Sequence, residues 1–400
     1  MERITVILRR NVLRTGKGDS GFLQLFISKR LLQGAAAALV GIFLPIYIYT
    51  ATDNQFWVVG GFYAVASLCY ALLLPLAMHL TNKIGFSRTL VLGGVFSIAQ
   101  YALLYYAQQE LIWYFLPAIL LVFILFRLFH WVPFHVDFTL FTKEGERGRD
   151  VSLTFATIAF MGVVGPILAG FIIANSSYEV LFGVVTVLLV VSTISYSFVP
   201  ETDAFFEWRW YETFTHLFSK KFRGLTTGAF ANGAEIAVTM VAWPIFLFEL
   251  LDGNVLEIGA LSTVIVGVTI ALQFFVGRHL DKAKGNSIKT LQYGSVFYAI
   301  GWLLKIFVLS TVQVFLVGLY HNVTRIFTKT PFTALLYDMS GDQSRYVDEM
   351  TVIREMADHL GRVISLVLII GLTFVLPINY SFVIAVAASL ALNLIHQLQT

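Results

Sequence analysis

Residues 111–140, LIWYFLPAILLVFILFRLFHWVPFHVDFTL, decide the fold class of this chain. The stretch is long and apolar enough for one helix to cross a bilayer, which takes about 20 residues. Arg127 nevertheless lies near its middle. An arginine at mid-membrane depth costs at least about 2.5 kcal/mol on insertion scales, so it indicates either a functional site or a buried ion pair.

A second stretch repeats this pattern in the other half of the chain. Residues 312–337, VQVFLVGLYHNVTRIFTKTPFTALLY, carry Arg325 at the corresponding place. Other residues recur at the same offset of 198 or 199 positions, namely Pro45 with Pro244, Asp53 with Asp252, Asn82-Lys83 with Asp281-Lys282, Pro133-Phe134 with Pro331-Phe332, Arg147 with Arg345, and Asp150 with Asp348. A duplicated membrane protein with a cation at the same point in each half predicts a transport site between the halves.

The composition places the whole chain in a membrane. Hydrophobic residues make up 58% of the 400 residues and charged residues 13%, whereas soluble domains contain about 25% charged residues. We therefore expect the lipid bilayer as a partner. Nucleic acid is not expected, because the basic residues behind the net charge of +3 lie in short loops. The single cysteine, Cys69, excludes an intrachain disulfide.

Twelve apolar stretches are close to the length that a membrane-spanning helix needs. The predicted spans are 22–50, 57–79, 88–108, 111–140, 150–174, 178–199, 222–250, 255–276, 288–309, 312–337, 352–376 and 380–398. The predicted fold is all-α integral membrane, with twelve transmembrane helices in two pseudo-symmetric six-helix bundles. The predicted domains are an N-terminal bundle at 1–199, a cytoplasmic linker at 200–221 and a C-terminal bundle at 222–400. The aromatic residues of the linker favour an amphipathic segment at the membrane surface.

Lysine and arginine residues collect in the loops on one side of the predicted bundle. The loops on the other side contain Asp53, Glu110, Glu179, Asp252 and Glu257, and no lysine or arginine. By the positive-inside rule, both termini are predicted to be cytoplasmic. The expected location is the cell membrane (plasma or inner), as a multi-pass protein.

Two equivalent loops carry related motifs. Residues 79–88, HLTNKIGFSR, follow the second span, and residues 277–282, GRHLDK, occupy the matching place in the second half. Both are similar to the loop motif of the major facilitator superfamily, although Asn82 replaces the usual aspartate, which Asp281 keeps. The whole chain resembles this superfamily, which implies alternating access by rocking of the two halves. It also implies that loop residues stabilise one state at the cytoplasmic side, namely Asn82, Lys83, Arg88, Arg278, Asp281 and Lys282.

A glycine-proline motif lies in the fifth span. Residues 162–170, GVVGPILAG, resemble the motif of the superfamily's proton-linked exporters, which favours export. The buried cations favour an anionic solute, which either transport direction could serve. Glycines at helical spacing are also typical of close helix packing without any other role.

The resemblance places the first, fourth, seventh and tenth spans around a central cavity, across which Arg127 and Arg325 are expected to face each other. His130 follows Arg127 on the same broad face of its helix, and His321 and Lys329 lie one turn to either side of Arg325. We predict that these five residues bind the solute, because guanidinium groups bind carboxylate or phosphate in a bidentate manner. The alternative is that each arginine pairs with a carboxylate and holds helices together.

Four titratable residues are predicted to take part in proton coupling: Glu235 in the seventh span, Asp137 in the fourth, and Asp358 and His359 in the eleventh. Burial favours the protonated form of a carboxyl group, and a nearby arginine favours its charged form. A Glu235 that alternates between a proton and a cationic partner would couple transport to protons. The alternative is a static ion pair at Glu235.

Two further groups of charged residues have structural interpretations. Arg354, Asp358 and Arg362 recur every four residues in the eleventh span, a spacing that predicts a ladder of ion pairs along the helix. Lys305 lies near the outer end of the ninth span, and its amine is expected to extend to the membrane surface.

These observations predict a secondary active transporter, monomeric, which moves a small polar or anionic organic solute with protons as the coupling ion. A proton-linked exporter of drugs or metabolites is an alternative with the same fold. No enzymatic activity, cofactor or metal is expected, because the sequence shows no metal-spaced histidines and no nucleophile motif. Two alternatives of another class are a multipass membrane enzyme using His135 and Asp137, and a transporter-like lipid scramblase or receptor that reuses the fold.

Overall fold

The structure is a computed structural model, and it describes residues 23–141, 147–202, 204–280, 287–341 and 347–397. These residues form helices joined by short turns, with no strand among them. In the first half the elements are η1 (Phe26–Gln33), α3 (Gly34–Val40), α4 (Phe43–Ala51), α5 (Phe56–Ile84), α6 (Phe86–Tyr106), α7 (Gln108–Phe141), α8 (Arg147–Asn175) and α9 (Tyr178–Tyr196). The linker contains α10 (Trp210–Leu217) and η2 (Lys220–Phe222). The second half contains α11 (Arg223–Ala237), η3 (Val238–Ala242), α12 (Trp243–Leu250), α13 (Val255–Leu280), α14 (Ser287–Lys305), α15 (Thr311–Gly341), α16 (Val347–Thr373), η5 (Ile378–Ser381), α17 (Phe382–Ala391) and α18 (Leu394–Gln397).

Each predicted span coincides with one helix or with a run of helices, which confirms the all-α membrane fold. Eight of the described helices are long and apolar enough to cross a membrane on their own, and the helices Leu23–Val40 and Phe43–Ala51, bent by 41° at their junction, add a ninth. The tenth predicted span, α15, is less apolar because it carries Arg325 and Lys329. Two spans contain a π-helical turn, η1 in the first and η3 in the seventh.

Residues with left-handed backbone form the equivalent turns of the two halves. Asp53 and Asn54, between α4 and α5, have φ angles of 55° and 58°. Asp252 and Gly253, between α12 and α13, have φ angles of 49° and 77°. Asn, Asp and Gly adopt this conformation more readily than other residues. The repeated aspartates are therefore explained by the turns that they form.

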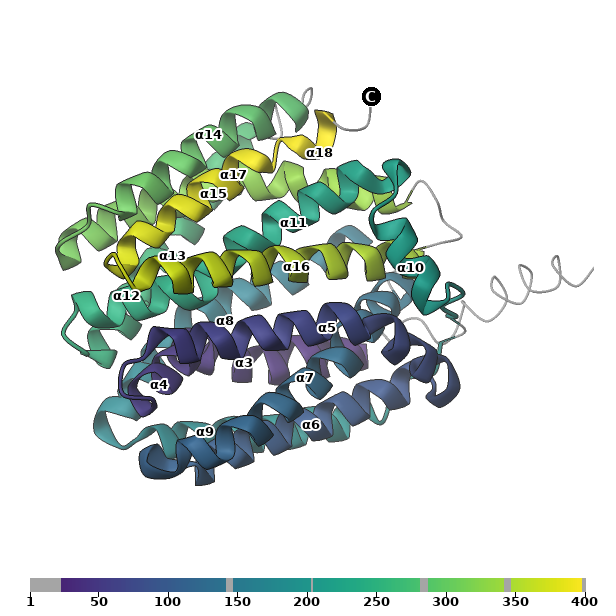
Figure 1. The fold of residues 1–400 in the computed structure, drawn as a ribbon, viewed down its shortest axis with the longest axis horizontal. Helices are drawn as coiled ribbons and strands as arrows, with labels where there is room; N and C mark the ends of the chain where they lie inside the picture. The colour runs from purple at the N-terminus through teal and green to yellow at the C-terminus, as the bar shows by residue number, and fades with distance from the viewer. Residues whose placement is uncertain (1–22, 142–146, 203, 281–286, 342–346, 398–400) are drawn as a thin grey trace, which may run out of the picture.

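The two halves lie side by side, with α4 and α12 at one end of the bundle and α10 at the other (Figure 1). We call these the α4 end and the α10 end. Along the boundary, α5 packs against α16 and α8 against α13. A Cβ added at Gly259 of α13 would meet the carbonyl oxygen of Pro166 in α8, and the hydroxyl of Thr263 donates to the carbonyl of Val163 at 2.6 Å. These contacts support the close-packing interpretation of the glycine-proline motif.

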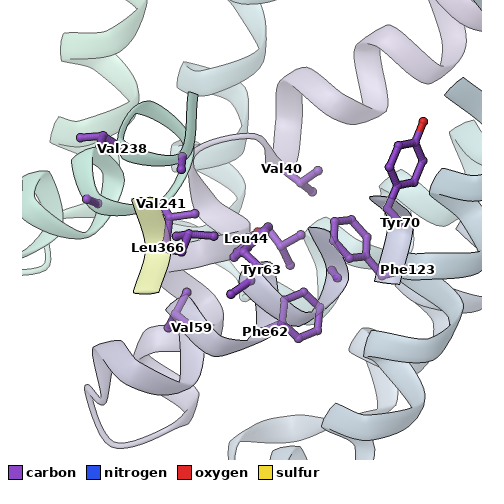
Figure 2. Close-up of a cluster of buried hydrophobic side chains, with 14 of the residues drawn as sticks. Val40, Leu44, Val59, Phe62, Tyr63, Tyr70, Phe123, Val238, Val241 and Leu366 are labelled. Carbon is purple, nitrogen blue, oxygen red and sulfur yellow. The ribbon is translucent and has the colours of Figure 1, made fainter. Parts of the chain in front are cut away.

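A cluster of apolar side chains joins the two halves where α4 begins. Leu44 of α4 lies with Val241 of η3 and Leu366 of α16 in one cluster of buried side chains (Figure 2). Closer to the α4 end, the hydroxyl of Tyr49 on α4 donates to Oε1 of Glu249 on α12 at 2.5 Å. Among the described residues, the halves therefore meet at the α4 end through apolar packing and the hydrogen bond between Tyr49 and Glu249.

The linker lies across the α10 end and contacts both halves. The backbone N–H of Glu207 donates to Oε1 of Glu349 on α16 at 3.0 Å, while Phe206 beside it is fully buried. Within the linker, α10 buries Leu217 and exposes Tyr211. This amphipathic pattern agrees with the one predicted for residues 200–221.

Candidate functional site

Glu235 lies at the centre of a buried polar network in the C-terminal half. Its side chain, on α11, is only 2% exposed. Its Oε2 atom pairs with Nζ of Lys329 on α15 at 2.8 Å. The hydroxyls of Tyr298 and Thr239 each donate to Oε1 at 2.7 Å. Both carboxylate oxygens are therefore satisfied by protein donors, which offsets the cost of burying this charge.

The network continues from Lys329 to α16. Nζ of Lys329 also donates to Oδ1 of Asn232, and Nδ2 of Asn232 donates to Oδ1 of Asp358, each at 2.7 Å. Arg362 donates to Oδ2 of Asp358 from Nε at 2.8 Å and from Nη2 at 2.7 Å. We call Glu235, Lys329, Asn232, Asp358 and Arg362 the Glu235 network. It connects α11, α15 and α16 through one unbroken series of hydrogen bonds.

Two glycines bring α11 and α16 close enough for this network to form. A Cβ added at Gly233 would overlap the backbone carbonyl of Asp358, and one added at Gly361 would overlap the carbonyl of Phe230. Backbones can approach this closely only where no side chain intervenes. The glycines therefore fix the amide of Asn232 against the carboxylate of Asp358.

Arg127 lies at the boundary between the halves. Its side chain is 7% exposed, and its Nη2 atom lies 3.2 Å from Nε2 of His359 on α16. The guanidinium carbon lies 5.3 Å from the ring centre of Phe123 and 5.8 Å from that of Tyr70. Its Nε atom has no hydrogen-bond partner, and no carboxylate of the described residues forms an ion pair with it. A buried guanidinium thus keeps one donor unused.

Arg325 has a different environment, although it occupies the equivalent place in the repeat. The side chain of Arg325 is exposed. His321, one turn earlier, is buried, and its ring stacks on that of Tyr298 in α14 at 4.5 Å between ring centres. Lys329, one turn later, belongs to the Glu235 network. The cationic stripe expected along this helix is therefore divided among three environments. That Arg127 and Arg325 face each other across a cavity stays a prediction.

His130 contacts a lysine that the sequence analysis did not single out. The histidine is fully buried, and its Nε2 atom lies 2.6 Å from Nζ of Lys29 in η1. The same amine lies 4.2 Å from the ring centre of Trp131. A lysine near the start of an apolar span resembles a group that extends to the membrane surface, so sequence alone gave no signal for this contact.

Asp137 lies at the α10 end, where the linker covers it. The hydroxyl of Thr202 donates to its Oδ1 atom at 2.8 Å. The side chain is fully buried, and Oδ2 has no hydrogen-bond partner. The sequence places His130 on the same helix face as Arg127, but these two side chains and that of Asp137 have separate partners.

The loop residues predicted at the cytoplasmic side differ from one another in the contacts that they make. Asn82 exchanges two hydrogen bonds with the backbone of Phe206 in the linker, at 2.8 and 3.0 Å. An amide can donate and accept at once, whereas the usual aspartate could only accept, which explains the asparagine. Arg88 lies 3.6 Å from Glu201, and Lys83 is exposed. The side chain of Arg278 and the whole of Asp281 and Lys282 lie outside the described residues.

The ion-pair ladder expected along α16 is partly formed. Asp358 pairs with Arg362 four residues later at 2.7 Å, as the spacing predicts. Arg354 pairs with its neighbour Glu355 at 3.0 Å. The acceptor positions of Asp358 are taken by Asn232 and Arg362, so the contacts of this helix are set by its packing against α11.

Lys305 is buried, whereas the sequence predicts that its amine extends to the membrane surface. It is 4% exposed, and its amine lies 3.9 Å from the ring centre of Trp243 and 4.0 Å from that of Trp302. The faces of aromatic rings attract a cation. The two tryptophans therefore provide a buried environment in place of the surface.

Comparisons with known proteins concern both sequence and fold. Residues 30–224 match the family model described as Major Facilitator Superfamily. A relative from Bacillus subtilis (strain 168), Uncharacterized protein YqgE, is 24% identical over 247 residues. That alignment covers 60% of this chain and 56% of the relative, so the chain spans little more than half the length of the curated relative that it matches.

Solved structures with a similar fold cover nearly the whole chain. A POT family transporter in complex with 5-aminolevulinic acid has a TM-score of 0.69 at 10% identity, covering 94% of this chain and 95% of that one. A peptide transporter POT in complex with alafosfalin has a TM-score of 0.65 at 11% identity, covering 95% and 93%. At such low identity the likeness concerns the fold, and it includes both halves.

Proposed function

We propose that this chain, of which residues 30–224 match the model of the Major Facilitator Superfamily and of which both halves share the fold of solved transporters, is a secondary active transporter of a small solute bearing an anionic group. One observation carries the proposal. Arg127 is buried at the boundary of the halves, has an unused donor, and pairs with no described carboxylate. A cation in that position needs a partner, and an anionic solute supplies one.

The chemistry of the arginine narrows the solute class. A guanidinium binds a carboxylate or phosphonate through two parallel hydrogen bonds. The ligands of the two fold relatives, 5-aminolevulinic acid and alafosfalin, both carry such an acidic group. We therefore propose a small organic acid or zwitterion as the solute, with Arg325 and Lys329 adding positive charge from the other half.

Glu235 is the residue proposed to couple transport to protons. Its carboxylate holds Lys329 at 2.8 Å, so adding a proton would remove the charge that restrains this lysine. The released lysine would change the contacts of α15 with α11 and α16, through Asn232. The contact at the α4 end would alternate with closure at the α10 end as the halves rock.

We also propose that the protein lies in the cell membrane, with both of its termini on the cytoplasmic side.

The proposal is tested with purified protein in liposomes. Labelled 5-aminolevulinic acid serves as the first probe, followed by a panel of small carboxylates, with and without an imposed pH gradient. We expect accumulation above equilibrium that a protonophore abolishes. A protein that moves none of these solutes, but scrambles fluorescent lipids in the same vesicles, would contradict the proposal and favour the scramblase alternative.

The role of Glu235 is tested separately. Glu235→Gln keeps an oxygen that accepts from Tyr298 and Thr239, but it cannot exchange a proton. We expect this variant to lose gradient-driven accumulation and to keep solute exchange at equal pH. Glu212→Gln, on the exposed surface of α10, is the matched control and is expected to behave as the wild type. Unchanged accumulation in Glu235→Gln would remove Glu235 from the coupling mechanism.

A further inference from the structure

Asp137 carries a buried carboxyl group that the proposed transport cycle leaves unused. Its side chain, on α7, is fully buried, and the hydroxyl of Thr202 donates to its Oδ1 atom at 2.8 Å. Its Oδ2 atom has no hydrogen-bond partner, and no described lysine or arginine forms an ion pair with it. His135, two positions earlier on α7, lies about 200° around the helix. Asp137 thus lacks the partners that allow Glu235 to be buried as a carboxylate.

The charged groups that act on Asp137 are acidic. Glu201 in the linker and Asp348 at the start of α16 both have an electrostatic effect on it. Of the described basic residues at this end, Arg88 on α6 lies 3.6 Å from Glu201, and Lys83 on α5 is exposed. A second negative charge in this place would be repelled by its neighbours.

These surroundings favour the neutral form of the carboxyl group. A carboxylate that is removed from water without a cation costs far more than a protonated carboxyl group, so such a group binds a proton instead. The proton belongs on Oδ2, because Oδ1 accepts from Thr202. The equivalent position of the repeat is occupied by Leu335. The helical framework therefore does not require a polar side chain here.

We propose that Asp137 binds a proton at the α10 end and that the linker shields this proton from water. When the linker moves away from α7, water reaches the carboxyl group. The O–H bond at Oδ2 then breaks, the proton passes to water, and a carboxylate remains. This step rests on the proposed function, because the linker moves only as the halves rock. Asp137 thereby adds to Glu235 a second proton-binding group, in the N-terminal half.

The experiment is infrared spectroscopy of the full chain in lipid at neutral pH. A protonated carboxyl group has a C=O stretching band that a carboxylate lacks. We expect one such band in the wild type that is lost in Asp137→Asn. Asp53→Asn is the matched control and should keep the band, because Asp53 is exposed and asparagine also adopts its left-handed backbone. If Asp137→Asn does not fold, Asp137→Leu replaces it, since the repeat has leucine at this place.

Exchange of the proton tests the part played by the linker. After transfer to D2O, the band shifts as deuterium replaces the proton. We expect slower exchange in the wild type than in Thr202→Val, which lacks the hydroxyl that joins the linker to Oδ1. Thr215→Val removes an exposed hydroxyl of α10 and is the matched control, expected to exchange as the wild type does.

Identical bands in the wild type and the folded Asp137 variant would overturn the proposal, since Asp137 would then be ionised. Equal exchange in the wild type and Thr202→Val would overturn the shielding by the linker. Neither measurement uses a solute, so both outcomes are distinct from failure of the proposed transport function. A protein that transports no carboxylate can still show the band, and a proton-driven transporter can lack it.

Discussion

Arg127 and Arg325 are equivalent in the repeat, and the structure gives them opposite environments. Arg127 is buried between the halves and contacts His359, whereas Arg325 is exposed beside a lysine that belongs to the Glu235 network. The turns at Asp53 and Asp252 kept the same left-handed backbone in both halves. The duplication has therefore preserved the helical framework, while the partners of the buried charges have diverged.

The largest effect should come from removing the buried member of this pair of arginines. Arg127→Ala is expected to reduce the initial rate of proton-driven uptake about 100-fold, because truncating a buried charged group typically costs about 2–5 kcal/mol. Arg325→Ala should reduce it about 10-fold, since an exposed cation contributes less. Uptake rates in proteoliposomes, normalised to incorporated protein, compare the two. A larger loss in Arg325→Ala would reverse the assignment of the principal solute cation.

The next effect concerns the buried ion pair between Glu235 and Lys329 in the C-terminal half. Lys329→Met leaves Glu235 buried without its cation, which should lower the free energy of unfolding by about 3–5 kcal/mol. Adding Glu235→Gln to that variant should recover part of the loss, because the remaining group is neutral. Thermal midpoints of the two single variants and the double variant form a mutant cycle. Strict additivity would show that the two side chains do not interact.

A smaller effect is expected where α11 meets α16. Gly233→Ala places a methyl group against the carbonyl of Asp358, and overpacking of this kind costs about 1–3 kcal/mol. Gly267→Ala is the matched control, because a Cβ there meets nothing within 4 Å. We expect a lower thermal midpoint for the first variant only. Equal midpoints would mean that the two helices can separate slightly without loss of stability.

The smallest effect is expected at the surface. Arg88 lies 3.6 Å from Glu201, with 78% and 42% of the two side chains exposed. Exposed pairs of this kind contribute at most about 1 kcal/mol, so Arg88→Ala should leave the thermal midpoint nearly unchanged. A marked fall would indicate that this loop residue supports the structure through contacts other than its ion pair.

The helical framework could be predicted because it depends on local properties of the sequence. Apolar length sets a membrane span, and the repeated offset placed twelve of them in two halves. Asp358 and Arg362 were expected to pair because they lie one helical turn apart. Interactions within one helix follow from its periodicity alone.

Contacts between helices could not be predicted in the same way. The pairing of Lys29 with His130, and of Asn82 with Phe206, depends on which helix or linker segment lies opposite. Lys305 was expected at the surface, because helical periodicity gives no information on the two tryptophans that surround it. The sequence indicates which groups are costly to bury, whereas the packing decides which partners compensate them.

The contact between Arg127 and His359 has a consequence for the empty carrier. When no solute is bound, the histidine already occupies one edge of the guanidinium. A solute can bind at the unpaired Nε atom while the histidine stays in place, and without a solute the histidine still satisfies one donor of the buried guanidinium. A transporter whose buried arginine keeps a protein partner such as His359 can change between its two states without a bound solute. We therefore expect net one-way transport, without an obligatory counter-solute.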